Sequence, residues 1–177
     1  GLMIANDINK LRAGILSENV ERFGLQNTIV TNSDPVKLEK YFNNFFDKII
    51  LDAPCSGEGM FRKLDQAVET WSIEKVNECA YIQRNLINSA YQMLKDEGIL
   101  IYSTCTYSLE ENEDQVKYMT NDLQMELLEI KKQPGMASGY QNDKVVRMYP
   151  HLNKGEGQFI ALLKKHTNGS TKKINFL

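Results

Sequence analysis

The sequence predicts an α/β fold with a mostly parallel sheet covered by helices, and three observations lead to this prediction. Apolar patterns typical of strands and of helices alternate along most of the 177 residues. The helical patterns place apolar residues three and four positions apart, which puts them on one side of a helix. The strand patterns are short, rich in β-branched residues and followed by turn-forming residues. A composition of 42% hydrophobic and 25% charged residues fits one globular domain.

The first quarter of the chain contains two strand-helix pairs. The helical pattern of the first pair carries apolar residues from Leu11 to Phe23 and stops at Gly24. In the second pair Asp34 precedes Pro35, and an acid before a proline is typical of a helix start. The predicted elements are a strand at 2–5, a helix at 8–23, a strand at 28–31 and a helix at 35–42.

The rest of the chain continues the alternation of strands and helices. Ser72 is a candidate cap for a long helix that we expect to end at Gly98. Ser108 and Glu111 have the spacing of a capping box, which predicts a helix to about residue 121. We expect the last two strands to form an antiparallel edge. The predicted strands are 46–52, 99–104, 125–130 and 158–165, the last two joined by a Pro-, Gly- and Asn-rich connection at 133–157.

Composition and length exclude several classes of protein. No apolar stretch reaches the roughly 20 residues of a membrane span, and the N-terminus lacks a secretory pattern, so we expect a cytoplasmic protein without a membrane partner. The three cysteines fit neither a disulfide framework nor a zinc pattern, so we expect free thiols and no metal. The net charge of −2 neither supports nor excludes an RNA partner. We expect one domain over 1–166 and a polar tail or linker over 167–177.

Reactive or acidic residues follow four of the predicted strands. In open parallel sheets, ligands bind at the carboxyl ends of the strands, which makes these positions candidates for a functional site. Each also has a structural interpretation, because acids cap helices and anchor turns, and a lone cysteine is more often a small buried apolar residue. Cys79 keeps that interpretation. The candidates are Asp7, Asp34, Asp52, Cys55 and Cys105.

Two of these candidates are thiols that meet if their strands are neighbours. Cys55 follows the strand 46–52, and Cys105 follows the strand 99–104. A thiolate attacks electrophilic carbon readily when a helix N-terminus or a cation lowers its pKa, and a predicted helix begins just after Cys105. From the residues alone, the sequence therefore predicts a thiol-using α/β enzyme.

Four segments of the sequence carry a resemblance to a known family. They read ILDAPCSGEGMFRK, WSIEKVNECAYIQ, YSTCTYSLEENE and RMYPHLNKGEGQFIALL. In this order they resemble the RNA (cytosine-5) methyltransferases of the Nop/Sun type, bacterial ribosomal-RNA branch, over residues 2–164. The resemblance implies a Rossmann-like, S-adenosylmethionine-dependent methyltransferase sheet. It also implies methyl transfer to carbon 5 of cytosine in RNA, with ribosomal RNA as the first expectation and transfer RNA as the other.

The resemblance also implies roles for three of the candidates. The Thr-Cys motif of the family implies that Cys105 attacks carbon 6 of the cytosine. The acid at the strand end implies that Asp52 protonates or hydrogen-bonds ring nitrogen 3, which eases the attack. The Pro-Cys motif implies that Cys55 helps to release the carbon-5 proton.

Further positions match the cofactor and RNA contacts of the family. An acid after a strand binds the ribose hydroxyls of S-adenosylmethionine, because a carboxylate makes two charge-assisted hydrogen bonds to a diol. The positively charged matches named below have an alternative interpretation as ordinary solvent-exposed surface residues. The matches are Asp7 at the ribose, Asp34 at the adenine and amino end, Asp52 and Arg12 as further cofactor contacts, and Arg62 and Lys63 as RNA phosphate contacts.

The resemblance further implies a strand and a Pro-Gly-Gly-Lys cofactor loop that these 177 residues do not contain. We therefore expect the first, central strand of the sheet to be missing and the chain alone to bind cofactor weakly or not at all. Two alternatives stay open. One is a catalytically incomplete RNA-binding or assembly remnant. The other is a thiol hydrolase, which needs a histidine base, and only His151 and His166 are present.

Overall fold

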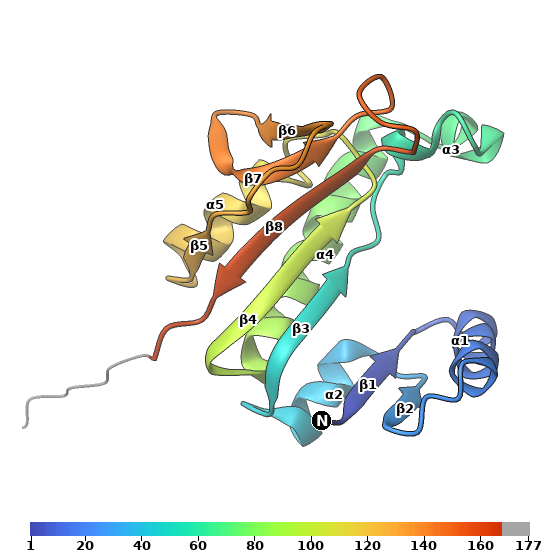
Figure 1. Cartoon of the computed structure of the whole chain (residues 1–177), viewed down its shortest axis with the longest axis vertical. Coiled ribbons are helices and arrows are strands. Elements are labelled where there is room, and N and C mark those ends of the chain that lie inside the picture. The colour runs from blue at the N-terminus through green and yellow to red at the C-terminus, as the bar shows by residue number, and fades with distance from the viewer. Residues whose placement is uncertain (168–177) are drawn as a thin grey trace, which may run out of the picture. The chain divides into compact units, whose positions relative to one another are not determined.

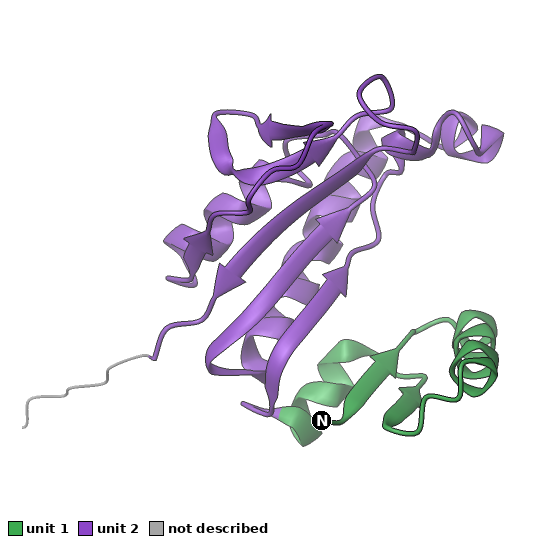
Figure 2. Ribbon diagram, viewed as in Figure 1, with its two compact units in different colours: residues 1–42 green, residues 43–177 purple. Residues whose placement is uncertain are grey.

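The computed structural model describes residues 1–167 and divides into two compact units. Figure 2 shows unit 1, Gly1–Phe42, and unit 2, Asn43–Leu177. Each unit is described by itself. The single domain expected over 1–166 stays a prediction, and the expected tail lies, from residue 168 on, outside the described residues. No helix within residues 1–167 is both long and apolar enough to cross a membrane.

Unit 1 contains the two predicted strand-helix pairs. Its strands are parallel neighbours, with Met3 opposite Thr28 (Figure 1). The predicted cap of the second helix is confirmed, because the Asp34 carboxylate accepts a hydrogen bond from the Val36 backbone N–H at 3.0 Å. The elements are β1 Met3–Asn6, α1 Lys10–Arg22, β2 Thr28–Thr31 and α2 Pro35–Phe42.

The apolar side of α1 is exposed. Its periodicity predicted the helix correctly, but Leu11 is 80% exposed and Phe23 is 70% exposed. Ala13 is the one buried residue of residues 1–42, all of which the structure describes. In most folds, burial of the apolar side is the main source of helix stability. Helix α1 has little of this burial within unit 1.

Unit 2 is built on a six-stranded sheet. Strand order is β3-β4-β8-β7-β6, and β5 also pairs with β8. Only β3 and β4 are parallel within this sheet, and β8 runs antiparallel to β4. The α/β class with an antiparallel C-terminal strand is thus confirmed, while the missing central strand stays a prediction. The elements are β3 Phe46–Asp52, η1 Glu58–Met60, α3 Asp65–Glu69, α4 Ile73–Met93, β4 Leu94–Thr104, α5 Glu113–Asn121, β5 Glu126–Leu128, β6 Met136–Gly139, β7 Asn142–Met148 and β8 Gln158–Lys164.

The core of unit 2 lies between the sheet and two helices. Helices α4 and α5 both lie behind the sheet in the view of Figure 1. Each large apolar side chain that is buried in such a core contributes about 1.5–3 kcal/mol to the free energy of unfolding. The fully buried members include Ile87 from α4, Leu100 and Tyr102 from β4, Met119 from α5, and Phe159 and Leu163 from β8. This core fixes the two strands whose ends carry the cysteines.

The long helix α4 begins as predicted but ends earlier. The Ser72 side chain accepts from the Lys75 N–H at 3.1 Å, which confirms the N-cap. The C-terminus is at Met93 rather than at Gly98. The physical reason is Lys165, whose buried Nζ donates to the carbonyl oxygens of Tyr91 and Leu94 at 2.9 and 2.8 Å. The last carbonyl groups of a helix need hydrogen-bond donors from outside the helix. In a glycine cap these donors are backbone N–H groups of the following residues, whereas here the donor is the Lys165 ammonium group.

Two further predictions in unit 2 were wrong. Helix α5 begins at Glu113, five residues after Ser108. The Ser108 hydroxyl does donate to Glu111 at 3.0 Å, but the Glu111 carboxylate is buried and also accepts from Ser56, so the pair does not open the helix. The connection predicted over 133–157 contains a hairpin, β6 and β7. Gly139 ends β6 and Asn142 begins β7, while Val145 and Val146 of β7 are fully buried.

Candidate functional site

Three loops meet at the carboxyl ends of β3 and β4. The first loop follows β3, the second follows β4, and the third precedes β8. Gly59 of the first loop donates its N–H to the Cys105 carbonyl at 2.9 Å, and its own carbonyl accepts from the Gly157 N–H at 3.2 Å. A side chain at Gly59 does not fit, because a Cβ there would lie 2.7 Å from the Gly157 oxygen. The glycines therefore allow backbone-to-backbone contact between all three loops.

The two cysteines at the strand ends lie against each other. Strands β3 and β4 are parallel neighbours, and the Sγ atoms of Cys55 and Cys105 are 3.1 Å apart. Both side chains are half-buried. The expected convergence of the two thiols is therefore found. Cys79 is buried on α4, and burial raises its pKa to about 11, as for a cysteine of the core.

The contact between the thiols makes them chemically unequal. A hydrogen bond from Cys55 lowers the pKa of Cys105 to about 7, although burial opposes this. The same hydrogen bond, together with burial, raises the pKa of Cys55 far above its ordinary value. The contact therefore favours the form in which a Cys105 thiolate accepts a hydrogen bond from a Cys55 thiol.

Asp52 stands at the end of β3, on the same edge of the sheet. Its carboxylate accepts a hydrogen bond from the Ser103 hydroxyl at 2.9 Å, across the β3–β4 pairing. It is exposed, and its charge is close enough to raise the pKa of Cys105 against the stronger effect of Cys55. The structure thus brings together the three residues with predicted catalytic roles.

A buried carboxylate connects the two cysteine loops, and sequence reasoning missed it. Glu111 is 0% exposed and accepts from the Ser56 N–H at 3.0 Å and the Ser56 hydroxyl at 2.5 Å. The Ser56 hydroxyl in turn accepts from Thr106 at 2.8 Å. Ser56 follows Cys55 and Thr106 follows Cys105, so this network fixes the two cysteine loops relative to each other.

Gln83 extends the network into α4. Its amide Nε2 donates to Glu111 at 2.8 Å and to the Pro54 carbonyl at 2.9 Å. One feature of the sequence could have indicated this network, because Gln83 is a polar residue on the otherwise apolar side of α4. Such a residue, buried at 0% exposure, needs hydrogen-bond partners from another segment.

The loop after Cys105 is held by further buried groups. The Asn112 amide donates to the Thr106 carbonyl at 3.0 Å. Arg147 of β7 donates to the Tyr107 carbonyl at 2.9 Å and forms a buried ion pair with Glu113. The hairpin that the sequence did not predict therefore anchors the loop that follows Cys105.

The two cations predicted to contact RNA lie in the loop after η1. Arg62 and Lys63 are exposed and form no salt bridge with any residue that the structure describes. The positive charge of Arg62 lowers the pKa of Tyr107, although burial dominates and raises it. Arg62 is thus close to the loop that carries Cys105.

The predicted cofactor residues of unit 1 lie together at the ends of β1 and β2. Asp7 does not cap α1, because Asn9 does so and the Asp7 carboxylate accepts from the Asn9 N–H at 2.8 Å. Arg12 forms a salt bridge with Asp7 at 3.1 Å. The Asn32 amide donates to the Asp7 carbonyl at 2.7 Å, which ties the two strand ends together.

Neither histidine is placed as a base for a cysteine. The His151 ring stacks on Tyr149 with ring centroids 5.4 Å apart, and His166 lies 3.4 Å from Glu126. Among the described residues, the side-chain partner of Cys105 is Cys55. The structure therefore gives no support to a thiol hydrolase, which needs a histidine in contact with its nucleophile.

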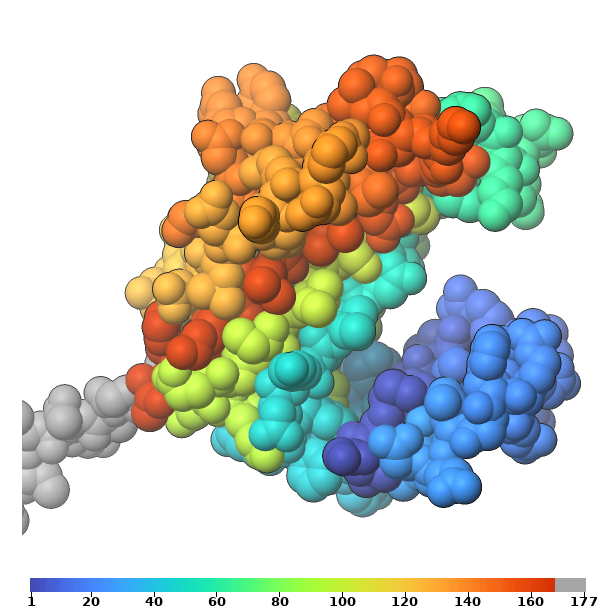
Figure 3. All heavy atoms as spheres, in the orientation of Figure 1, coloured from blue at the N-terminus to red at the C-terminus, as the bar shows by residue number. Residues whose placement is uncertain are grey.

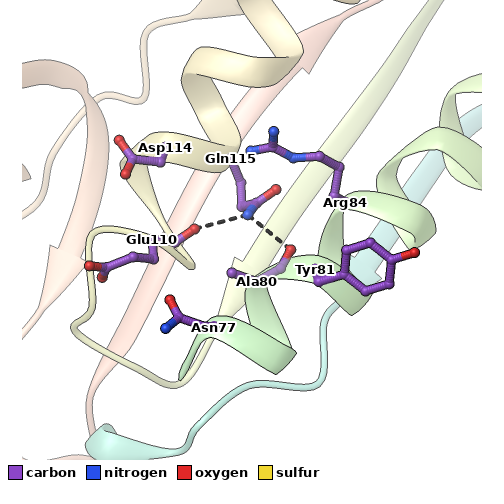
Figure 4. Close-up of a pocket in the computed structure, with 7 residues that line it drawn as sticks. All are labelled: Asn77, Ala80, Tyr81, Arg84, Glu110, Asp114 and Gln115. Carbon is purple, nitrogen blue, oxygen red and sulfur yellow. Dashed lines mark hydrogen bonds between the residues drawn. The ribbon is translucent and has the colours of Figure 1, made fainter. Parts of the chain in front are cut away.

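A separate hollow of about 320 Å³ lies between α4 and the first turn of α5 with the residues before it (Figure 4). Gln115 forms its floor and donates to the carbonyls of Ala80 and Glu110 at 3.1 and 2.9 Å. Arg84, Glu110 and Asp114 lie around it with mixed charge. It contains neither cysteine and is not part of the thiol site.

The α/β sheet has the fold of S-adenosylmethionine-dependent methyltransferases. Solved structures below 25% identity share this fold, among them a SAM-dependent O-methyltransferase from Thermotoga maritima, with a TM-score of 0.51 and 15% identity. The chain belongs to the family described as 16S rRNA methyltransferase RsmB/F, whose sequence model matches residues 1–164.

Individual relatives agree with this family. Ribosomal RNA small subunit methyltransferase F of Aeromonas hydrophila is 36% identical over 94% of this chain and 36% of its own length. The same-named protein of Psychromonas ingrahamii is 38% identical over 93% and 35%. NSun6 from Pyrococcus horikoshii, solved with SFG, matches with a TM-score of 0.84 and 37% identity over 95% of this chain and 42% of that one. The chain thus spans about a third of the length of these curated relatives.

Proposed function

We propose that the full-length protein carrying this chain transfers a methyl group from S-adenosylmethionine to carbon 5 of a cytosine in RNA, through a covalent bond between Cys105 and the base. The observation that carries the proposal is the thiol pair of Cys55 and Cys105, with Sγ atoms 3.1 Å apart beside Asp52. The names of the curated relatives favour small-subunit ribosomal RNA as the substrate.

The first step is addition of Cys105 to the cytosine ring. Carbon 5 of cytosine is a poor nucleophile until a nucleophile adds to carbon 6 and converts the ring to an enamine. Cys105 suits this role because its pKa of about 7 leaves much of it as thiolate at neutral pH. Cys105 lies in a half-buried loop that Asn112 and Arg147 hold in place. Because the sulfur is already restricted in orientation, its attack on the base has a lower entropic cost.

Asp52 assists the addition at the other side of the ring. Negative charge develops toward ring nitrogen 3 when the thiolate adds, and a proton held there by a carboxyl group disperses it. Asp52 is exposed at the strand end, and its Oδ1 is oriented by the Ser103 hydroxyl at 2.9 Å. Asp52 is paired with Ser103, which lies two residues before Cys105.

Cys55 is suited to act only after Cys105 has reacted. Its raised pKa arises first from the hydrogen bond with Cys105 and then from burial. Bond formation between Cys105 and carbon 6 removes the thiolate and therefore the largest cause of that shift. The pKa of Cys55 then falls, so that Cys55 can release its own proton to solvent. The resulting thiolate can take the carbon-5 proton that must leave before Cys105 is eliminated.

The acids of unit 1 fit the nucleoside part of the cofactor. Asp7 and Asp34 follow parallel neighbouring strands, which is where open α/β sheets bind nucleosides. Oδ1 of Asp34 accepts from Val36, and its Oδ2 has no hydrogen-bond partner among the described residues. Arg12 holds the Asp7 carboxylate at the end of β1 in position. When bound, S-adenosylmethionine supplies the methyl group for carbon 5.

Methyl transfer by single-cysteine variants tests the proposal. The full-length protein is incubated with labelled S-adenosylmethionine and unmodified small-subunit ribosomal RNA transcribed in vitro, and bisulfite sequencing locates the product. Cys105→Ala is expected to abolish transfer, whereas the matched control Cys79→Ala retains it because Cys79 lies in the core of α4. Methylation by Cys105→Ala would contradict the assignment. RNA binding without any methylation by the wild type would favour an RNA-binding role instead.

A further inference from the structure

Three aromatic rings form a stack that begins two residues after Cys105. The Tyr107 ring stacks on Tyr149 with centroids 5.4 Å apart and planes 26° apart, and Tyr149 stacks on His151 at 5.4 Å and 29°. Tyr107 and Tyr149 are half-buried, whereas His151 is exposed. The stack therefore leads from the nucleophile loop to the surface and ends in an exposed ring.

The inner end of the stack is fixed by its backbone. The Tyr107 N–H donates to Glu58 at 2.9 Å, and its carbonyl accepts from Arg147 at 2.9 Å. The ring also packs so closely on Gly157 that no side chain fits there. The rings are thus held in place before any ligand arrives, which lowers the entropic cost of binding a flat partner.

Two polar atoms at this end have no partner. The Tyr107 hydroxyl and the Glu156 Oε2 are buried and make no hydrogen bond within the part of the chain that the structure describes. Buried polar atoms of this kind are rare, because each costs about 1–3 kcal/mol when unpaired. The inner end of the stack is therefore bordered by two polar groups whose hydrogen-bonding capacity is unused.

Positive charge accompanies the rings. Arg62 is close enough to Tyr107 to act on it electrostatically, and Lys154 is exposed in the loop that follows His151. In Figure 3 that loop, in orange-red, lies against the green segment around α3, so both belong to one surface of unit 2. An aromatic face with adjacent cations has the chemistry that binds a nucleotide: stacking for the base and charge for the phosphate.

We infer that His151 at the exposed end of this stack binds a nucleobase adjacent to the target cytosine, with Arg62 near the neighbouring phosphate. The inference rests on the proposed function, because it takes the ligand to be RNA. A cytosine that reaches Cys105 has left the base stack, and its neighbour loses a stacking partner. The His151 ring replaces that partner, which keeps the neighbouring base in a defined position.

Binding and kinetics of two His151 variants test the inference. His151→Ala removes the ring, His151→Phe keeps a flat ring, and Tyr81→Ala is a matched control because Tyr81 is 70% exposed on α4. With unmodified small-subunit ribosomal RNA, we expect His151→Ala to weaken binding about tenfold and to raise KM with little change in kcat. His151→Phe and Tyr81→Ala are expected to bind like the wild type. Wild-type binding by His151→Ala, or equal losses in the Ala and Phe variants, would overturn the inference.

A coupling experiment shows whether the ring contacts a base. A short RNA fragment centred on the methylated cytosine is prepared with an abasic site at each flanking position in turn. The wild type should lose about tenfold in affinity at one flanking position, whereas His151→Ala should lose no more there. Equal losses in both proteins at every position would contradict base stacking on His151.

The outcomes separate this inference from the proposed reaction. If the wild type binds RNA through His151 but forms no bond between Cys105 and cytosine, the reaction fails and the base-binding site stands. If His151→Ala forms that bond with wild-type dependence on RNA concentration, the base-binding site fails and the reaction stands.

Discussion

In unit 2 the groups around the cysteines are buried and bonded to one another, whereas in unit 1 the acids at the strand ends make exposed contacts. Glu111 is 0% exposed and accepts from Ser56 and Gln83, while Asp7 pairs with a largely exposed Arg12. Buried hydrogen-bonded networks fix geometry, and exposed ion pairs contribute about 0–1 kcal/mol. The difference indicates that the thiol site is preorganised within unit 2, while the acids of unit 1 remain accessible to a ligand.

The largest expected effect comes from removing the buried carboxylate of unit 2. Glu111→Ala leaves the donors of Ser56 and Gln83 without an acceptor, so we expect a loss of about 3 kcal/mol of unfolding free energy. Urea unfolding of the full-length protein measures it, and alkylation of Cys105 should slow in the same variant. The neighbour Glu110 is exposed, and Glu110→Ala serves as the control. Equal stability of the two variants would show that the network does not hold the loops.

The next effect concerns the inequality of the two thiols. Cys55→Ala removes the hydrogen bond that lowers the pKa of Cys105, so the midpoint of its alkylation by iodoacetamide should rise from about 7 toward 9.0. The sign follows because the bond stabilises the thiolate, and without it a higher pH is needed to deprotonate Cys105. At pH 7 alkylation should slow about tenfold. Cys55→Ser retains a donor and should fall between the two, and an unchanged midpoint in Cys55→Ala would contradict the coupling.

A change in unit 1 should affect ligand binding rather than stability. We expect Asp7→Asn to weaken S-adenosylmethionine binding by the full-length protein about tenfold, because a neutral amide loses the charge-assisted bonds to the ribose. Its unfolding free energy should change by no more than about 0.5 kcal/mol, since the pair with Arg12 is exposed. Calorimetric titration measures the affinity. Asp47→Asn, which also loses an exposed ion pair, is the control. Equal affinities would remove Asp7 from the cofactor site.

The smallest expected effect lies on the exposed side of α1. Leu11→Gln should change the unfolding free energy by about 0.5 kcal/mol or less, because Leu11 is 80% exposed. The buried counterpart Ala13→Gln should cost more, since a larger polar side chain must enter a packed position. A loss of several kcal/mol from Leu11→Gln would show that this side of α1 is covered in the full-length protein.

The sequence predicted the elements whose signals are local. Strands β1, β2 and β3 have short β-branched or apolar patterns, and the caps at Asp34 and Ser72 need only residues two or three positions away. The meeting of Cys55 and Cys105 was also predictable, because it follows from two parallel strands being neighbours.

The errors arose where a distant residue took over a local role. Glu111 has the spacing of a capping box and does accept from Ser108, but it also accepts from Ser56, 55 residues away, which draws it into the core. The end of α4 depends on Lys165, 71 residues from Leu94. The hairpin β6–β7 was hidden because Gly139 and Asn142, which are residue types that usually mark a loop, end β6 and begin β7. The aromatic stack ending at His151 likewise joins two loops that no local pattern connects.

Trapping of the covalent intermediate tests the central claim most directly. Small-subunit ribosomal RNA transcribed with 5-fluorocytidine blocks the release step, because fluorine at carbon 5 cannot leave as a proton does. We predict that the full-length protein forms a denaturant-stable adduct with this RNA and S-adenosylmethionine, and that peptide mass spectrometry places the bond on Cys105. Cys55→Ala should accumulate an adduct even with ordinary cytosine. An adduct on any other residue, or one that persists in Cys105→Ala, would contradict the account.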